Sequence, residues 1–211
     1  MNKAEVIKQI REIGIIPVVR ATTAEEAMRA IDAIREGGIS VLEITMTVPN
    51  AFSLIELVTT RFGSDALVGA GTVLDAETAK SCIACGARFI VSPALNLETI
   101  GYCREQDVAV MPGALTPTEV VQAWNAGADF VKVFPAEAVG GPSYLRALKA
   151  PLPQIELVPT GGVNLKTAAD FIKAGAAALG VGADLVQGES SEVTERARQF
   201  VDIVRQARLI G

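Results

Sequence analysis

The chain has 211 residues and a mass of 22.1 kDa, a size that suits one large domain. Half of its residues are hydrophobic and 5% are aromatic, so we expect an aliphatic core. The net charge of −5 argues against a surface for nucleic acid or anionic membrane, although local groups could still bind a small anion. The sequence contains no histidine, which excludes histidine nucleophiles, imidazole general bases and histidine-liganded metals.

The N-terminal segment has the spacing of a short amphipathic helix. Val6, Ile7, Ile10 and Ile13 recur at helical intervals, with charged residues between them. The segment has no uninterrupted apolar run, so it resembles neither a signal peptide nor a membrane anchor. We therefore expect a cytoplasmic protein in which this helix lies on the core.

Short β-branched runs alternate with helical stretches along the rest of the chain, which predicts eight βα units. The expected strands are Ile15–Arg20, Val41–Thr45, Leu67–Gly71, Phe89–Ser92, Val108–Met111, Phe130–Phe134, Ile155–Pro159 and Ala178–Val181. Helical spacing is clearest in Ala24–Arg35, Ala51–Thr60, Thr118–Ala126 and Leu165–Ala174.

A pair of small residues that begins with glycine recurs in every second βα unit. This repeat favours closure of the strands into a barrel. The pairs beginning at Gly37, Gly86, Gly127 and Gly175 each fit a helix C-terminus just before the second, fourth, sixth or eighth strand. An even number of apolar parallel strands favours one (β/α)₈ TIM barrel over residues 1–211, with an extra N-terminal helix. The main alternative is a doubly wound open sheet. Its dinucleotide fingerprint is missing, because no third glycine follows residues 69–71.

Three cysteines do not form a disulfide framework. Cys82 and Cys85 make a C-x-x-C that a redox site could use. The motif falls inside a predicted helix, however, and no other metal ligands accompany it. We expect reduced, packed thiols.

Polar residues near the carboxyl ends of the strands are the candidate site residues, because barrel active sites form there. Arg20 ends the first strand and Thr72 follows the third. Either side chain could bind a substrate carboxylate, and either could instead be a loop residue that caps the next helix.

Two charged residues interrupt otherwise apolar strands. Glu43 shares a face of the second strand with Val41 and Thr45. Lys132 alternates with Val131 and Val133, whose packing against helices would place the lysine inside the barrel. Burying an ammonium group is costly unless it is paired or loses its proton. The two residues could form an acid–base couple around a nucleophilic amine, or only a structural ion pair.

Glycines follow the last two strands, in Pro159–Val163 and Gly180–Asp184. Backbone N–H groups at this place in a barrel commonly bind phosphate. Tight-turn geometry alone could also explain either glycine pair. Their occurrence at both expected strand ends favours phosphate.

Taken together, the sequence motifs around these residues resemble those of the 2-keto-3-deoxy-6-phosphogluconate (KDPG) and 4-hydroxy-2-oxoglutarate (KHG) aldolases. The likeness runs from Ile15 to Val186 and is carried by Leu42–Thr45, Gly69–Leu74, Val91–Pro93, Met111–Gly113, Lys132–Glu137 and Pro159–Val163. The resemblance implies a cofactor-free class I carbon–carbon lyase of carbohydrate metabolism. Such an enzyme cleaves a phosphorylated 2-keto-3-deoxy sugar acid, or KHG, to pyruvate and an aldehyde through a lysine Schiff base. It also implies a homotrimer and a role of the Entner–Doudoroff type.

The resemblance assigns roles to individual residues. Lys132 would form the Schiff base, and Glu43 would transfer protons. The expected substrate-binding residues are Arg20, Thr47, Thr72, Pro93, Phe134 and Thr160, and the expected phosphate-binding residues are Gly161, Gly162, Gly182 and Ala183.

Two positions depart from the family pattern. Many members have arginine where this chain has Thr47, so Arg20 is the expected substitute for binding the carboxylate. Many have serine where this chain has Ala183, so a hydroxyl is lost while the N–H remains.

Other functions fit the same residues less well. A phosphate-binding isomerase would use Lys132 only as an electrostatic group, and a silent barrel would serve as a scaffold or anion-binding module. A covalent imine with pyruvate separates an aldolase from both. The sequence does not distinguish gluconate-derived from galactonate-derived substrates, which differ at one stereocentre.

Overall fold

A computed structural model describes residues 1–209 of the chain; residues 210 and 211, the end of the predicted domain, lie outside the described residues. The strands are short and parallel, and each is buried along its whole length. They are β1 (Ile15–Val19), β2 (Val41–Thr45), β3 (Leu67–Gly71), β4 (Phe89–Val91), β5 (Ala109–Met111), β6 (Gly113–Ala114), β7 (Val131–Val133), β8 (Leu157–Pro159) and β9 (Leu179–Val181).

The strands form a closed barrel. One parallel series runs β5-β4-β3-β2-β1-β9, and a second runs β6-β7-β8. Isolated bridges join Leu157 to Ala176 and Thr160 to Gly180, which connects β8 with β9. On the other side, β5 and β6 are separated only by Pro112, whose carbonyl accepts a hydrogen bond from the Lys132 N–H. β5 and β6 are thus the two halves of the fifth barrel strand, and the predicted eight-stranded barrel is confirmed.

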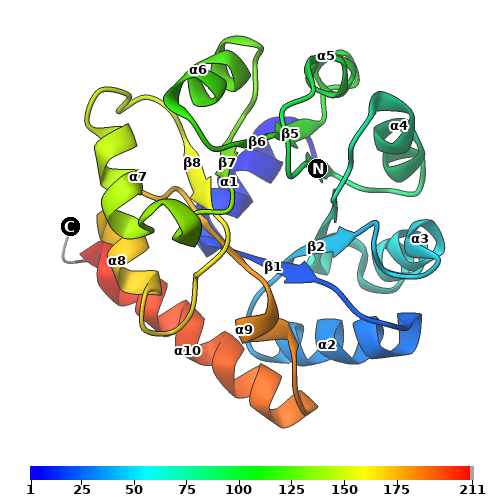
Figure 1. The fold of residues 1–211 in the computed structure, drawn as a ribbon. Helices are drawn as coiled ribbons and strands as arrows, with labels where there is room; N and C mark the ends of the chain where they lie inside the picture. Colours follow the sequence, from blue (N-terminus) through cyan, green and yellow to red (C-terminus); the bar gives the residue numbers. More distant parts are fainter. Residues whose placement is uncertain (210–211) are drawn as a thin grey trace.

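Helices surround this ring on its outside, as Figure 1 shows. They are α2 (Ala24–Glu36), α3 (Ala51–Phe62), α4 (Ala76–Ala84), α5 (Leu97–Glu105), α6 (Pro117–Asn125), α7 (Pro142–Lys149), α8 (Ala168–Lys173) and α10 (Ser190–Leu209). Short helical segments occur in the connections: η1 (Gly63–Asp65), η2 (Glu137–Val139) and α9 (Ala183–Val186).

The predicted N-terminal helix is present as α1 (Lys3–Ile13) and covers the end of the barrel where the strands begin. Its buried residues Val6 and Ile10 pack against the apolar side chains inside the barrel. Asn2 and Glu5 form a capping box at its start. At its other end, the Arg208 guanidinium of α10 donates hydrogen bonds to the last carbonyls of α1. α1 therefore covers the end of the barrel opposite the carboxyl ends of the strands.

Alternation along each strand divides the core into two clusters. Val131 and Val133 belong to the outer cluster between strands and helices, whereas Phe130 belongs to the inner one. Lys132 consequently faces the barrel interior, as its spacing predicted. Val41 of the inner cluster marks the face of β2 that also carries Glu43.

The repeated glycines have the backbone that their positions predicted. Gly38, Gly86, Gly127 and Gly175 all have φ between 94° and 101°, the left-handed region that favours glycine. Each lies just after a helix and before the next strand, so the C-terminal cap interpretation is confirmed.

The predicted helix over 165–174 is shorter in the structure. It begins only at Ala168, because Asn164 and Thr167 form a turn first. The Asn164 side-chain oxygen accepts hydrogen bonds from the N–H groups of Lys166 and Thr167. The Thr167 hydroxyl donates to the Gly162 carbonyl, which ties this turn to the glycine pair after β8.

The cysteines are free thiols in the structure. Burial raises the pKa of both Cys82 and Cys103 to about 12, the opposite of a redox-active thiol. Cys85 caps the end of α4 rather than opening a helix. Within residues 1–209, no helix combines the length and apolar character needed to cross a membrane.

Candidate active site

Lys132 and Glu43 meet inside the barrel. The Nζ of Lys132 lies 3.8 Å from Oε1 of Glu43, and the two residues are 3% and 2% exposed. Lys132 is on β7 and Glu43 on β2, so strands from different parts of the ring bring the pair together. The Phe134 ring lies 5.4 Å from the Lys132 Nζ and covers it, as the resemblance implied.

The electrostatics of Glu43 favour a carboxyl that can hold a proton. Burial raises its pKa above the usual value, and the nearby charges of Lys132 and Arg20 oppose this shift only in part. Oε1 of Glu43 is buried and has no hydrogen-bond partner among the described residues. A carboxyl of this kind is suited to accepting and returning a proton.

A pocket of about 320 Å³ lies at the carboxyl ends of the strands. Neither Lys132 nor Glu43 lines it, but Phe134, whose ring lies against Lys132, and Arg20, whose charge acts on Glu43, both do. The structure brings together there many of the residues predicted for substrate and phosphate binding: Arg20, Phe134, Thr160, Gly161, Gly162, Gly182 and Ala183. Gly161 and Gly162 have φ of 93° and 74°, so their turn requires the left-handed backbone as well. An ideal Cβ at Gly182 would meet no atom within 4 Å, so this glycine faces open space.

The remaining predicted substrate residues lie at neighbouring strand ends but do not line this pocket. Thr47 is exposed, and its hydroxyl lies 2.7 Å from the Thr45 hydroxyl, with which it forms a hydrogen bond. The Thr45 hydroxyl also donates a hydrogen bond to the Val19 carbonyl. Thr72 has φ of 58°, a strained conformation for a β-branched residue. Pro93 follows β4, with its carbonyl close to Gly113.

The pocket also contains residues that the sequence analysis missed. Val18 and Gly180 line it from inside the barrel, and Asp184 and Gln187 line its rim. The first two could have been found by strand alternation, since Val18 precedes Arg20 by two residues and Gly180 precedes Gly182 by two. Asp184 carries a negative charge beside the glycines predicted to bind phosphate.

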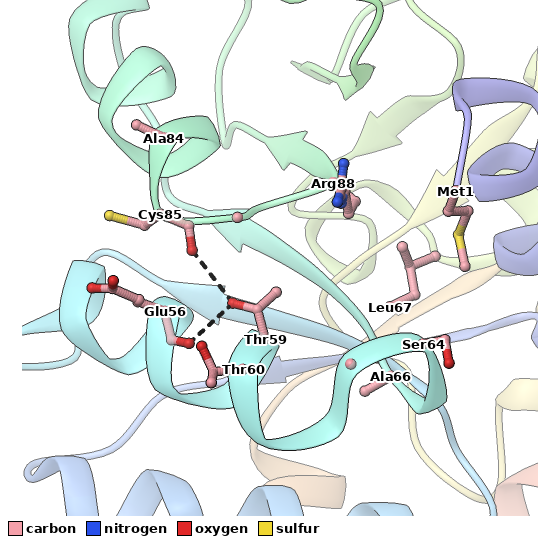
Figure 2. A pocket seen from close by; sticks show the side chains of 12 residues that line it. Met1, Glu56, Thr59, Thr60, Ser64, Ala66, Leu67, Ala84, Cys85 and Arg88 are labelled. Carbon is pink, nitrogen blue, oxygen red and sulfur yellow. Dashed lines mark hydrogen bonds between the residues drawn. The ribbon is translucent and has the colours of Figure 1, made fainter.

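A second pocket, of about 420 Å³, lies near the opposite end of the barrel and is shown in Figure 2. Its lining includes Met1, Leu67 at the start of β3, and Arg88 just before β4. The Thr59 hydroxyl in its wall already bonds the Cys85 carbonyl at 3.3 Å, which ties α3 to α4. None of the residues predicted for catalysis, substrate binding or phosphate binding lines this pocket.

Over residues 1–209, no cluster of three or more Cys, Asp or Glu side chains is arranged to hold a metal ion. The charged groups that act on Glu43 are the Lys132 amine and the Arg20 guanidinium. A buried lysine beside a carboxylate, in a (β/α)₈ barrel whose pocket lies at the carboxyl ends of the strands, is an arrangement that suits enzymes of the imine-forming class.

Comparison with known proteins identifies the family. The family model for KDPG and KHG aldolases matches residues 6–201. A 2-dehydro-3-deoxy-phosphogluconate aldolase of Treponema pallidum is 32% identical, over 94% of this chain and 97% of its own. A 2-dehydro-3-deoxy-6-phosphogalactonate aldolase of Escherichia coli is 36% identical, over 93% of this chain and 97% of its own.

A solved structure links this fold to covalent chemistry. The KDPG aldolase of Legionella pneumophila, with pyruvate captured as a covalent carbinolamine intermediate, superposes with a TM-score of 0.81. It is 29% identical, and the match covers 96% of this chain and 97% of that one. The chain therefore belongs to the KDPG and KHG aldolase family and is a class I aldehyde-lyase that forms a Schiff base.

Proposed function

We propose that this enzyme cleaves KDPG to pyruvate and glyceraldehyde 3-phosphate, with Lys132 as the Schiff-base residue. The observation that carries the proposal is the placement of a buried amine 3.8 Å from a buried carboxylate, in a barrel with a pocket at the carboxyl ends of its strands. This arrangement supplies a nucleophile and a proton acceptor at one point.

The reaction follows from these two groups. The Lys132 amine attacks the C2 carbonyl of the substrate to give a carbinolamine. With the uptake of one proton, the carbinolamine loses its hydroxyl as water and becomes a protonated imine. Glu43 removes the proton of the C4 hydroxyl, the C3–C4 bond breaks, and its electron pair enters the imine as an enamine. The aldehyde leaves, C3 of the enamine takes a proton from Glu43, and water then releases pyruvate from Lys132.

Arg20 is proposed to bind the substrate carboxylate. It lines the pocket and lies near enough to lower the pKa of Glu43 by its charge, so its guanidinium is close to the reacting centre. Thr47 is already hydrogen-bonded to Thr45 and is too short to substitute for an arginine. Thr72 and Pro93, at the adjoining strand ends, are proposed to contact the pyruvate half of the substrate. Thr160 is proposed to contact the rest of the substrate.

The phosphate is proposed to lie against the backbone of Gly161, Gly162, Gly182 and Ala183. The two loops meet in the pocket because Thr160 pairs with Gly180 across the β8–β9 seam. Glycines let the phosphate approach the backbone closely, and Gly182 leaves its part of the pocket open. Asp184 at the rim opposes this binding by charge.

Substrate preference is the part of the proposal that a direct assay decides. KDPG, its galactonate-derived epimer and KHG should be compared by pyruvate release under identical conditions. We expect the highest kcat/KM for KDPG and detectable cleavage of the other two. A higher kcat/KM for the epimer would assign the enzyme to galactonate-derived substrates, and a higher value for KHG would remove the phosphate role.

We also propose that the enzyme is a cytoplasmic homotrimer that acts in an Entner–Doudoroff type of sugar-acid breakdown. Apolar side chains that support self-association are exposed on one part of the helical ring: Phe52 and Leu57 on α3, Leu74 before α4, and Leu97 at the start of α5. The Asn96 side chain donates a hydrogen bond to the Leu74 carbonyl, which ties the segment before α4 to the start of α5. Burying these side chains against further copies of the chain would remove them from water.

A further inference from the structure

The inner face of β3 carries almost no side chains where the site begins. Gly69 and Gly71 occupy two consecutive inward positions, and neither has a positive φ. Alanine could therefore adopt the backbone conformation at both positions. The reason for glycine must be space rather than conformational freedom.

The two glycines make room for different side chains. An ideal Cβ at Gly71 would lie 2.0 Å from Oε1 of Glu43, and 2.6 Å from both its Cδ and its Cγ. A Cβ at Gly69 would lie 2.4 Å from ring atoms of Phe89. Gly71 is thus pressed against the proposed proton-transfer group, whereas Gly69 is pressed against the apolar filling of the barrel.

We infer that Gly71 is a positioning residue whose bare Cα supports the Glu43 carboxylate and sets its approach to Lys132. The inference rests on the proposed roles of Glu43 and Lys132. The strand cannot easily retreat from the carboxylate. Gly71 pairs with Thr45 in the β2–β3 register, and its carbonyl accepts a hydrogen bond of 2.8 Å from the Met46 N–H.

A methyl group at position 71 would move the carboxylate instead. The contact of 2.0 Å would have to open to at least 3.0 Å, a displacement of about 1 Å. Misplacement of a catalytic group by about 1 Å can lower a rate about 10²-fold. Imine formation needs the Lys132 amine and depends much less on the position of the carboxylate.

The test compares two reactions of the same variant. Gly71→Ala should still be trapped with pyruvate and borohydride at Lys132. The exchange of pyruvate methyl protons with D₂O, per trapped site, should fall by about 10²-fold. Gly69→Ala is the matched control, since it crowds Phe89 and should keep the wild-type exchange per trapped site. In a Glu43→Gln background, Gly71→Ala should cause no further loss, because the group on which it acts is gone.

A double-mutant cycle on thermal stability tests the contact between position 71 and Glu43 without any catalysis. Glu43→Ala removes the three atoms that would lie nearest to the methyl group. Gly71→Ala should therefore lower the Tm of the wild type and leave the Tm of Glu43→Ala unchanged. If Gly71→Ala alone does not fold, recovery of a folded chain in the double variant supports the same contact.

Two results would overturn the inference. They are wild-type exchange in a folded Gly71→Ala enzyme, and an equal loss of Tm with and without the Glu43 side chain. Failure of the proposed function is a distinct result: the wild type itself would not be trapped at Lys132, while the stability cycle would still report the contact.

Discussion

The Lys132 amine and the Glu43 carboxylate lie 3.8 Å apart on opposite parts of the strand ring, both almost completely buried. A buried ion pair is weak evidence for stability, because desolvating two charges costs about as much as their attraction returns. The separation also exceeds a hydrogen bond, which leaves the amine free to react. The arrangement therefore suits proton transfer during a reaction better than it suits stabilisation of the fold.

Removal of the proposed base should separate imine formation from proton transfer. Glu43→Gln keeps the size of the side chain but cannot accept a proton. We expect this variant to fold and to form trappable imine with pyruvate. Its cleavage rate and its methyl-proton exchange in D₂O should fall by about 10²–10⁴-fold, the usual contribution of a positioned acid–base group. Wild-type exchange in a folded Glu43→Gln enzyme would assign proton transfer to another group and leave Glu43 a structural role.

The raised pKa of Glu43 gives this exchange a defined pH dependence. A carboxyl that removes a methyl proton must be ionised, and burial raises its pKa above the ordinary 4.5. Exchange by the wild type should therefore decline on acidification at a pH above 4.5. Residual exchange by Glu43→Gln should not show this decline. A wild-type midpoint at or below the ordinary carboxyl value would contradict the effect of burial.

Phosphate should raise kcat/KM by more than about tenfold over the dephospho substrate, since charge-assisted bonds contribute roughly 1.5–3 kcal/mol each. Position 182 offers the clearest test, because a Cβ added there would meet no atom within 4 Å. Gly182→Asp should remove most of the preference, whereas Gly182→Asn, of equal size without the charge, should lose less. Equal rates of the wild type on both substrates would refute the proposed phosphate site.

Asp184 provides the opposite change in the same pocket. Its carboxylate is exposed at the rim, so Asp184→Asn removes a repulsive charge without disturbing the core. We expect a several-fold lower KM for the phosphorylated substrate and an unchanged KM for KHG. A lower KM for both substrates would show that the effect is not specific to phosphate.

The buried thiols should destabilise the fold in alkali. The pKa of Cys82 and of Cys103 rises from 9.0 to about 12 on folding, so the unfolded chain loses these protons first. Their contribution to stability is complete below pH 9 and is lost as pH rises toward 12. The Tm should fall over this range, and less steeply in Cys82→Ala/Cys103→Ala. An equally steep fall in that variant would show that other groups cause it.

Self-association should depend on the exposed apolar side chains. Sedimentation at micromolar concentration should give the mass of three chains for the wild type. Phe52→Asp combined with Leu74→Asp should shift the mass toward one chain, because the charges would be buried at the interface. Leu209→Asp is the matched control, because Leu209 is exposed on α10, away from the apolar side chains of α3 to α5. It should leave the mass unchanged. A trimer that persists in the double variant would place the interface elsewhere.

Strand alternation was enough to place Lys132 and Glu43 in the barrel interior, because a period of two leaves only two faces. The glycines before alternate strands likewise predicted their left-handed backbone. The break of the fifth strand at Pro112 was not predicted. It arises because proline cannot donate to the ladder, while the carbonyl of Pro112 still bonds Lys132.

The partners of individual side chains were less predictable. The Thr45–Thr47 hydrogen bond and the contact between Gly71 and Glu43 depend on distances between neighbouring strands and loops. Spacing along one strand does not specify such distances. Asp184 was not predicted as a pocket residue for a related reason, since only the folded loop brings it to the rim of the pocket.

Covalent capture with pyruvate would identify the residue that forms the imine. Incubation with pyruvate and borohydride should add one pyruvyl-derived mass per chain, on the peptide that contains Val131–Val133. Lys132→Arg should remain unlabelled and lack cleavage activity. Lys149 and Lys166 are internal controls: the first is bonded to the Pro153 and Ile155 carbonyls, and the second is exposed. A label on either of these lysines, or an unlabelled wild-type chain, would contradict the assignment of Lys132 as the Schiff-base residue.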